Sequence, residues 1–183
     1  TSPPSIIFSE SLLNQLSDEE KRFLFYKYIY YIAQNQILAY KLNLNKLERY
    51  FALLRKAFTQ DQNLTPEELT ITKRMKNAIP RKLRKTLTER ADLWENSIIK
   101  QSIKIYLKSL DFASNRFGLA LTDSLKLSTQ MVYKMSSYQT TKKFLQMPKK
   151  TKDISKFESL QDLFRYNISN IYKKLRKESG IVS

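Results

Sequence analysis

The chain has 183 residues, of which 42% are hydrophobic, and it contains no cysteine, no histidine and two glycines. This length is enough to bury a hydrophobic core in one domain, and so few glycines argue against sandwiches, barrels and glycine-rich phosphate loops. Without cysteine and histidine the chain has no disulfide, no thiolate nucleophile, and neither the commonest general base nor the commonest zinc ligand. We therefore expect residues 1–183 to form a single, mostly α-helical domain without a cofactor or metal.

Positive charge is concentrated in the later part of the chain. The net charge is +16, yet residues 1–72 contain 8 basic and 8 acidic side chains, whereas residues 73–183 contain 25 basic and 9 acidic ones. A field of this sign favours an anionic partner, which includes nucleic acid, an acidic protein surface or an anionic lipid surface. The composition does not choose among these three.

The beginning of the chain has none of the marks of a targeting or membrane segment. No run approaches the roughly 18 apolar residues that span a bilayer, and no basic segment followed by an apolar one resembles a signal peptide. The absence of cysteine fits a reducing compartment, so we expect a cytoplasmic protein. Residues 1–4, Thr-Ser-Pro-Pro, are typical of a linker remnant, and we expect the chain to be the C-terminal part of a longer protein.

The first predicted elements are a short extended segment and a long helix. Residues 5–8 are apolar enough to form a small strand. Ser17 is followed three residues later by Glu20, which is the pattern of a capping box at a helix start. We expect the helix that begins there to run to about Ala39.

Three further helical segments are predicted in the region of residues 44–94, the last of them over residues 81–94. Thr65 and Glu68 form a second capping-box pattern, with Pro66 at the first helical position, and Pro80 should end or restart that helix. Ahead of them, an apolar stripe at helical spacing predicts a buried helix face; it consists of Leu44, Leu47, Tyr50, Phe51, Leu54 and Phe58.

The remaining elements are also predicted to be helical. Residues 96–110 carry a second apolar stripe, made of isoleucine and leucine side chains. Gly118 is expected to interrupt the helix there, and Thr122 to cap another that runs to about Met135. Near the end of the chain, Ser169 should cap a short helix that Gly180 closes.

Two segments have a pattern in common with a family of metallopeptidases. Residues 4–32 read PSIIFSESLLNQLSDEEKRFLFYKYIYYI, and residues 111–127 read DFASNRFGLALTDSLKL. The first is similar to the opening of the gluzincin metallopeptidases of the CAAX-protease-like group, whose long helix carries an HExxH motif. The second resembles the ExxxD motif of the same family, which is usually followed by "R.GL". The resemblance implies a zincin-like helical core.

The positions that would bind and use the metal have changed identity in this chain. The resemblance places Lys27 and Tyr31 at the two histidines, Tyr28 at the catalytic glutamate, Asp111 at the third ligand and Asn115 at the aspartate of ExxxD. In HExxH the two histidines lie four residues apart on one helix face, so both can hold zinc. A protonated lysine cannot ligate a metal, and tyrosine is no general base near neutral pH. The resemblance therefore implies a degenerate metal site and an inactive pseudoenzyme.

The later part of the chain also resembles a module of larger proteins. Residues 91–119, ADLWENSIIKQSIKIYLKSLDFASNRFGL, and the terminal DLFRYNISNIYKKLRKESGI are similar to the C-terminal module of large bacterial tetratricopeptide-repeat proteins. This implies a missing N-terminal portion, because no helical-repeat units are found within these residues. A protein-interaction or scaffold role follows from that context.

Simpler interpretations of the same residues remain open. The aromatic-rich helix around Tyr28 could belong to the core of an unrelated helical bundle. Lys27 could extend along an apolar helix to reach solvent, and Asp111 and Arg116 could form an ion pair. An active metallopeptidase is the least favoured alternative.

Three basic clusters are candidates for binding an anionic partner. They span residues 73–85, 142–156 and 173–177, with seven, six and four basic side chains. Such clusters are what phosphate binding needs, but no known nucleic-acid-binding module is present; solvated lysine faces, a protein-docking surface and a membrane surface are the alternatives. The candidate residues are Lys73, Arg74, Lys76, Arg81, Lys82, Arg84, Lys85, Lys149, Lys150, Lys173, Lys174 and Arg176.

Taken together, these observations predict a non-catalytic interaction or scaffold domain of a larger bacterial protein with a basic surface. We expect a protein partner. We expect no small-molecule substrate and no membrane partner. The alternative is a nucleic-acid-binding helical domain that uses the three clusters.

Overall fold

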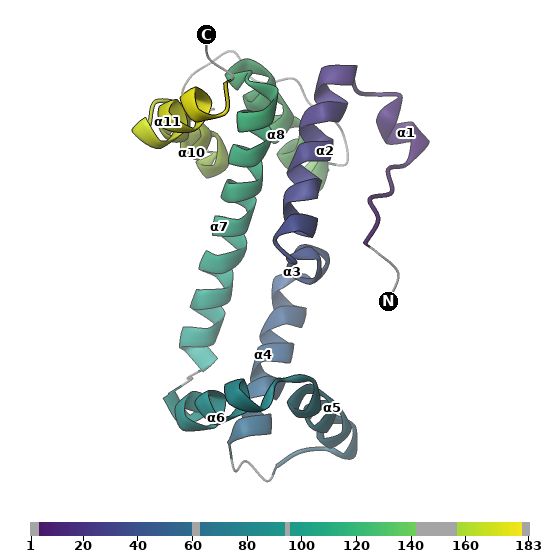
Figure 1. Cartoon of the computed structure of the whole chain (residues 1–183). Helices are drawn as coiled ribbons and strands as arrows, with labels where there is room; N and C mark the ends of the chain where they lie inside the picture. The colour runs from purple at the N-terminus through teal and green to yellow at the C-terminus, as the bar shows by residue number, and fades with distance from the viewer. Residues whose placement is uncertain (1–3, 60–62, 94–95, 142–156, 181–183) are drawn as a thin grey trace. The chain divides into compact units, whose positions relative to one another are not determined.

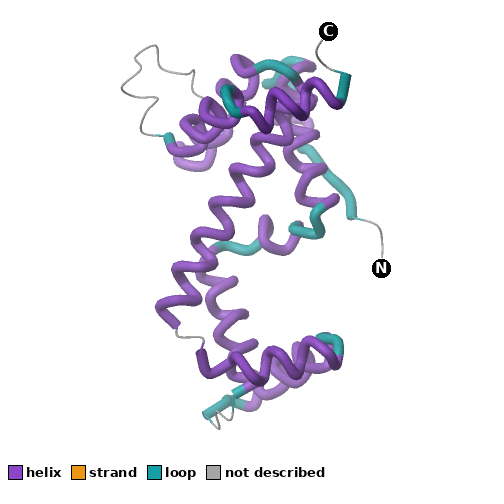
Figure 2. Tube along the Cα trace, turned by 60° about the vertical axis from the view of Figure 1, so that its left-hand side comes forward, coloured by secondary structure: helices purple, strands orange, loops and turns teal. Residues whose placement is uncertain are grey.

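The computed structural model describes residues 4–59, 63–93, 96–141 and 157–180. Within these ranges all regular structure is helical, as Figure 2 shows, which confirms the predicted mostly α fold. The suggested N-terminal strand is not found, because residues 5–8 have no regular structure. The chain divides into two compact units, one formed by residues 1–37 and 109–183 and the other by residues 38–108.

The helices of the first unit can be followed in Figure 1. They share one hydrophobic core. Helix α8 packs against both α2 and α10, and α10 also packs against α11. The core includes Phe23, Leu24, Leu119, Met131 and Leu163, all fully or almost fully buried. The helices of this unit are α1 (Glu10–Leu13), α2 (Asp18–Ala33), the later part of α7 (Asn96–Thr122), α8 (Leu125–Thr141), α10 (Glu158–Asn167) and α11 (Asn170–Glu178).

Helix α2 begins where the sequence predicts but ends earlier. Ser17 accepts a hydrogen bond from the backbone of Glu20, whose carboxylate accepts one from the Ser17 backbone, so the capping box is confirmed. The helix ends at Ala33 instead of about Ala39, since Asn35 adopts a left-handed backbone with φ 56°. Asparagine tolerates that conformation better than most residues. A short helix, α3 (Ile37–Lys41), follows.

Gly118 does not interrupt its helix, contrary to the prediction. Helix α7 continues through it to Thr122. The glycine serves close packing between helices, because a Cβ at this position would lie 2.6 Å from the buried ring of Phe23 on α2. Thr122 is not a cap either: its hydroxyl donates to the Gly118 carbonyl, 2.8 Å away. Ser124 fills that role for α8 and accepts from the backbone N–H of Leu127 at 3.2 Å.

The second unit contains shorter helices and a smaller core. Leu47 of α4 and Ile99 and Ile103 of α7 form its buried cluster, and α4 also packs against α5. Thr65 and Glu68 form the predicted capping box with Pro66 in the first turn, and Pro80 separates α5 from α6; both predictions are confirmed. The elements are α4 (Leu44–Phe58), α5 (Pro66–Ala78), α6 (Arg81–Arg90), the 3₁₀ turn η1 (Ala91–Leu93) and the early part of α7.

Candidate functional site

Lys27 lies in the middle of α2, and its side chain points into the first unit. The residue is 7% exposed, and its ammonium donates to Asp111 Oδ1 at 2.7 Å and to Asn115 Oδ1 at 2.6 Å. Both partners belong to α7 and are four residues apart, so they lie on one face of that helix. Lys27 therefore does not extend to solvent but is held by two acceptors inside the protein.

A third helix contributes to the same group of side chains. The other oxygen of the Asp111 carboxylate, Oδ2, accepts from Asn115 Nδ2 at 3.0 Å and from Ser159 Oγ at 3.1 Å. Ser159 belongs to α10, so these contacts join α2, α7 and α10. We call Lys27, Asp111, Asn115 and Ser159 the Lys27 cluster.

The two tyrosines of the predicted site lie beside this cluster. Tyr31 is 5% exposed, and its phenol oxygen lies 3.2 Å from Ser114 Oγ, which is also 2.8 Å from the Asp111 carbonyl oxygen. The ring of Tyr28 lies between those of Tyr31 and Phe8, with centroid separations of 6.3 and 5.9 Å. The structure thus brings Lys27, Asp111 and Asn115 into direct contact, Tyr31 next to them through Ser114, and Tyr28 into the aromatic packing.

The donor set of this site does not fit a zinc ion. The nearest groups are an ammonium, an amide, one carboxylate and phenol and alcohol oxygens, whereas zinc sites use thiolate, imidazole and several carboxylate donors. In the part of the chain that the structure describes, no group of three histidine, cysteine, aspartate or glutamate side chains could hold a metal. A cation is already supplied in this site by Lys27 itself.

Arg116 forms an ion pair, but with a different partner from the one expected. Its guanidinium donates to both carboxylate oxygens of Asp162 on α10, with Nε 2.9 Å from Oδ2, and lies over the Tyr166 ring at 5.2 Å from the centroid. The hydrogen bond with Asp162 raises the pKa of Arg116, and burial raises the pKa of Tyr166. The expected pair of Asp111 with Arg116 is wrong, because each has its own partner on another helix.

Sequence reasoning missed the partners that come from distant elements. Ser159 and Asp162 are 48 and 46 residues away from their contacts on α7. Glu20, expected only as a cap, also pairs with Lys134 of α8. No spacing in the sequence indicates these contacts, since they depend on how the helices pack.

The basic cluster at residues 73–85 lies on α5 and α6 of the second unit. Six of its seven basic side chains are exposed, and Arg84 is the exception. Arg84 Nε donates to the Ile79 carbonyl at 2.6 Å and Nη2 to the Asn77 carbonyl at 3.3 Å. Arg84 therefore stabilises the end of α5 and is no longer an obvious contact for an anion.

The other predicted basic residues are placed differently. Lys173, Lys174 and Arg176 lie on α11 of the first unit, where Arg176 pairs with Asp123 at 2.7 Å and Lys174 lies 3.7 Å from Glu178. Lys149 and Lys150, with the rest of the cluster at 142–156, fall outside the described residues. Only part of the predicted basic surface can therefore be placed.

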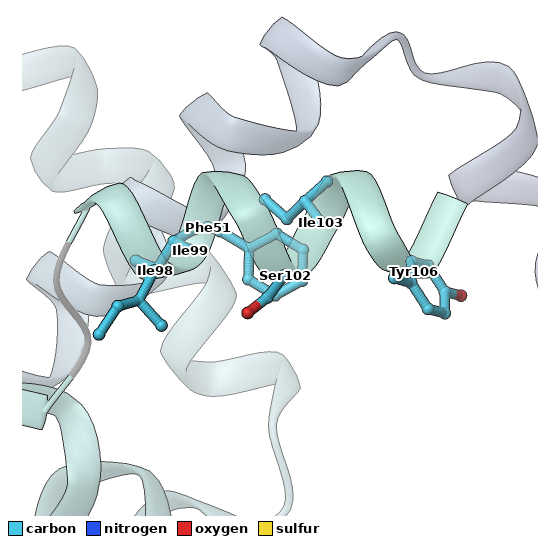
Figure 3. A pocket seen from close by; sticks show the side chains of 6 residues that line it. All are labelled: Phe51, Ile98, Ile99, Ser102, Ile103 and Tyr106. Carbon is cyan, nitrogen blue, oxygen red and sulfur yellow. The ribbon is translucent and has the colours of Figure 1, made fainter. Parts of the chain in front are cut away.

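The second unit also contains an apolar groove between α4 and α7, shown in Figure 3. Its volume is about 320 Å³, and it is lined by Phe51, Ile98, Ile99, Ser102, Ile103 and Tyr106. Ile98 and Tyr106 are 52% and 42% exposed. The sequence predicts a buried stripe here, but part of that stripe forms this open surface.

Among the residues described, no helix combines the length and the apolar character needed to cross a bilayer. Comparison with protein families, curated proteins and solved structures finds no match to this chain.

Proposed function

We propose that this chain is a catalytically inactive, zincin-like helical domain that acts as a protein-interaction or scaffold domain of a larger bacterial protein. The observation that carries the proposal is the position of Lys27. Its ammonium contacts Asp111 and Asn115, the residues that the resemblance aligns with the ExxxD motif. In this proposal a fixed cation of the protein takes the place of the family's metal.

This arrangement gives the former site a structural role. An ion pair that crosses between helices and is supported by amide and hydroxyl groups fixes the relative position of α2, α7 and α10. Tyr28 and Tyr31 fill the same helix face with aromatic surface instead of ligands. In this proposal the helix face is retained, and its residues pack against the neighbouring helices instead of binding a metal or activating water.

The groove in the second unit supports the interaction part of the proposal. Large exposed apolar side chains that lie together mark binding surfaces more often than isolated ones do. Residues 96–108 of α7 contain three lysines and no acidic side chain; Lys100 lies 3.9 Å from Glu48 of α4, and Lys104 is exposed. The partner that fits is an amphipathic helix with apolar side chains for the groove and acidic side chains that complement the net positive charge of this segment.

Restoring the family's residues tests the kinship. The variant K27H/Y28E/Y31H/D111E should bind one Co²⁺ or Zn²⁺ per chain, seen as the visible absorption of tetrahedral Co²⁺, because the four side chains would again share one site. The matched control K27H/Y28E/Y31H/D111A lacks the third ligand and should bind more weakly. A folded quadruple variant without stoichiometric metal would contradict the kinship, and peptidase activity of the unaltered chain would contradict the pseudoenzyme.

A peptide-binding measurement tests the interaction role. A synthetic amphipathic acidic helix should bind the chain, and I98E/Y106E should weaken this binding about tenfold or more through the loss of apolar contact. The control Q101E/K46Q changes the net charge equally, lies outside the groove lining and leaves the lysines of α7 unchanged. Equal losses in both variants, or equal binding of a basic helix of the same apolar pattern, would contradict the groove as the docking site.

A further inference from the structure

The helices α5 and α6 carry the highest local concentration of unpaired positive charge that the structure describes. Residues 69–88 contain seven basic side chains and no acidic one. Arg84 caps α5, and the other six have no carboxylate partner among the described residues. We call these six the α5–α6 basic surface: Lys73, Arg74, Lys76, Arg81, Lys82 and Lys85, all of them exposed.

These charges do not contribute to the packing of the second unit. No residue of α6 is buried, and Arg81 and Lys85 lie four residues apart on one helix face, where like charges repel. Among the described residues, Lys76 has one local contact, with its ammonium 5.5 Å from the centre of the Phe58 ring. A surface with this much unbalanced charge is suited to an anionic ligand with many charges.

The apolar content of the surface distinguishes among the possible anionic partners, which are a membrane, an acidic protein and nucleic acid. The large exposed apolar side chains of α5 and α6 are Leu69 and Leu83, and neither helix exposes an aromatic side chain. A membrane-binding helix needs an apolar face, and a protein interface needs a central apolar or aromatic contact. Contacts to nucleic-acid phosphates need only long, flexible cations.

We propose that the α5–α6 basic surface binds the phosphate backbone of nucleic acid without sequence preference. The six exposed cations contact phosphates and release counterions, and no base is read, because phosphate contacts carry no sequence information. This activity goes beyond the interaction role proposed above, and it depends neither on the kinship with metallopeptidases nor on the groove.

Fluorescence anisotropy of the whole chain with labelled nucleic acid tests the proposal. Duplex DNA, single-stranded DNA and RNA, each in two unrelated sequences, are titrated over a series of salt concentrations. Six phosphate contacts predict a slope of log affinity against log salt of up to about −5 on duplex DNA. Both sequences of each nucleic acid should bind with equal affinity, and at least one nucleic acid should bind at low salt.

Charge reversal locates the binding surface. R81E/K82E/K85E should lower the affinity about 100-fold or more and flatten the salt slope. K173E/K174E/K177E makes the same change in net charge on α11 of the first unit and should lower the affinity much less. The helical circular dichroism of both variants should equal that of the unaltered chain, since the reversed side chains on α6 are exposed.

Four outcomes would overturn the proposal. One is no binding to any nucleic acid at low salt, and a second is an equal loss of affinity in the two triple variants, which would indicate net charge instead of a local surface. A third is a strong preference for one sequence. The fourth is tighter binding to polyglutamate or to vesicles containing phosphatidylserine than to nucleic acid, which would assign the surface to an acidic protein or to a membrane.

Discussion

In the first unit, Lys27 is 7% exposed and its ammonium contacts a carboxylate and an amide oxygen from the facing helix. In the second unit, the six cations of the α5–α6 basic surface are exposed and have no carboxylate partner among the described residues. The same type of side chain therefore performs opposite tasks. A buried ammonium must be matched by acceptors inside the protein, whereas an exposed one is satisfied by water until a ligand replaces it.

This difference shows why a count of charges says little about what they do. The excess of basic residues is a property of composition. Lys27 and Arg84 donate hydrogen bonds to acceptors within the protein, whereas the six exposed cations have no carboxylate partner among the described residues. Substitutions should therefore separate the two classes: loss of an internal cation should reduce stability, and loss of an exposed one should reduce only binding.

The largest effect is expected at Lys27. K27A should lower the free energy of unfolding by about 2–4 kcal/mol, because it leaves Asp111 and Asn115 without their buried donor. Urea denaturation followed by circular dichroism measures the change. K21A on the same helix is the control, since Lys21 forms an exposed pair with Asp18 and should lose less than about 0.5 kcal/mol. Similar losses in K27A and K21A would contradict a structural role for the Lys27 cluster.

The next largest effect is expected at Gly118 of α7, which lies against the Phe23 ring of α2. G118A would place a Cβ 2.6 Å from Phe23, which is fully buried, so the ring cannot move aside into solvent. We expect a net loss of about 1–2 kcal/mol, since overpacking exceeds the gain in helix propensity. The double variant G118A/F23L should recover part of the loss in thermal unfolding. A G118A variant more stable than the unaltered chain would show that the contact is not restrictive.

A smaller effect is expected at Arg84 in the second unit. R84A removes two hydrogen bonds to carbonyls at the end of α5 and should cost about 1 kcal/mol, since its side chain is only partly buried. R81A should cost nothing and could raise stability slightly, because it removes a positive charge from the first turn of α6. Chemical denaturation of the two variants compares them directly. Equal stability of R84A and R81A would contradict this prediction, because it would show that Arg84 contributes no more to stability than an exposed cation does.

The smallest effect concerns acid and the start of α5. The hydrogen bond from the Thr65 backbone holds the pKa of Glu68 below its ordinary value of 4.5. A carboxyl with a lowered folded-state pKa stabilises the protein above its unfolded-state pKa, and this contribution is lost as the pH falls through the folded value. E68Q should therefore show less loss of stability than the unaltered chain as the pH is lowered from about 5 to 3. An identical pH dependence of the two proteins would contradict the contribution of this cap.

The local features of the fold could be predicted because their causes lie within a few residues. Ser17 and Glu20, Thr65 and Glu68, and Pro80 act on the backbone next to them, and the structure confirms all of these boundaries. The ends of helices were less predictable. A favourable helical pattern continued past Ala33, but the left-handed backbone at Asn35 ended the helix there.

The sequence also predicted the positions of the candidate site but not their chemistry. Lys27, Asp111 and Asn115 were selected through a resemblance, and the structure places them in contact. Their hydrogen bonds to one another, and the contribution of Ser159, could not be predicted from spacing. The pairing of Arg116 with Asp162 was also not predictable, because Asp111 was the nearer acid in sequence.

By itself, the sequence determined the helical content, the capped helix starts and the uneven distribution of charge, because these depend on residue types and on neighbours along the chain. Tertiary structure alone decided which cations are internal and which are exposed, that Gly118 is needed inside a continuous helix, and that part of an apolar stripe is open as a groove. Each of these depends on which side chains of distant helices meet, and a contact across 46 or 84 residues leaves no periodic signal.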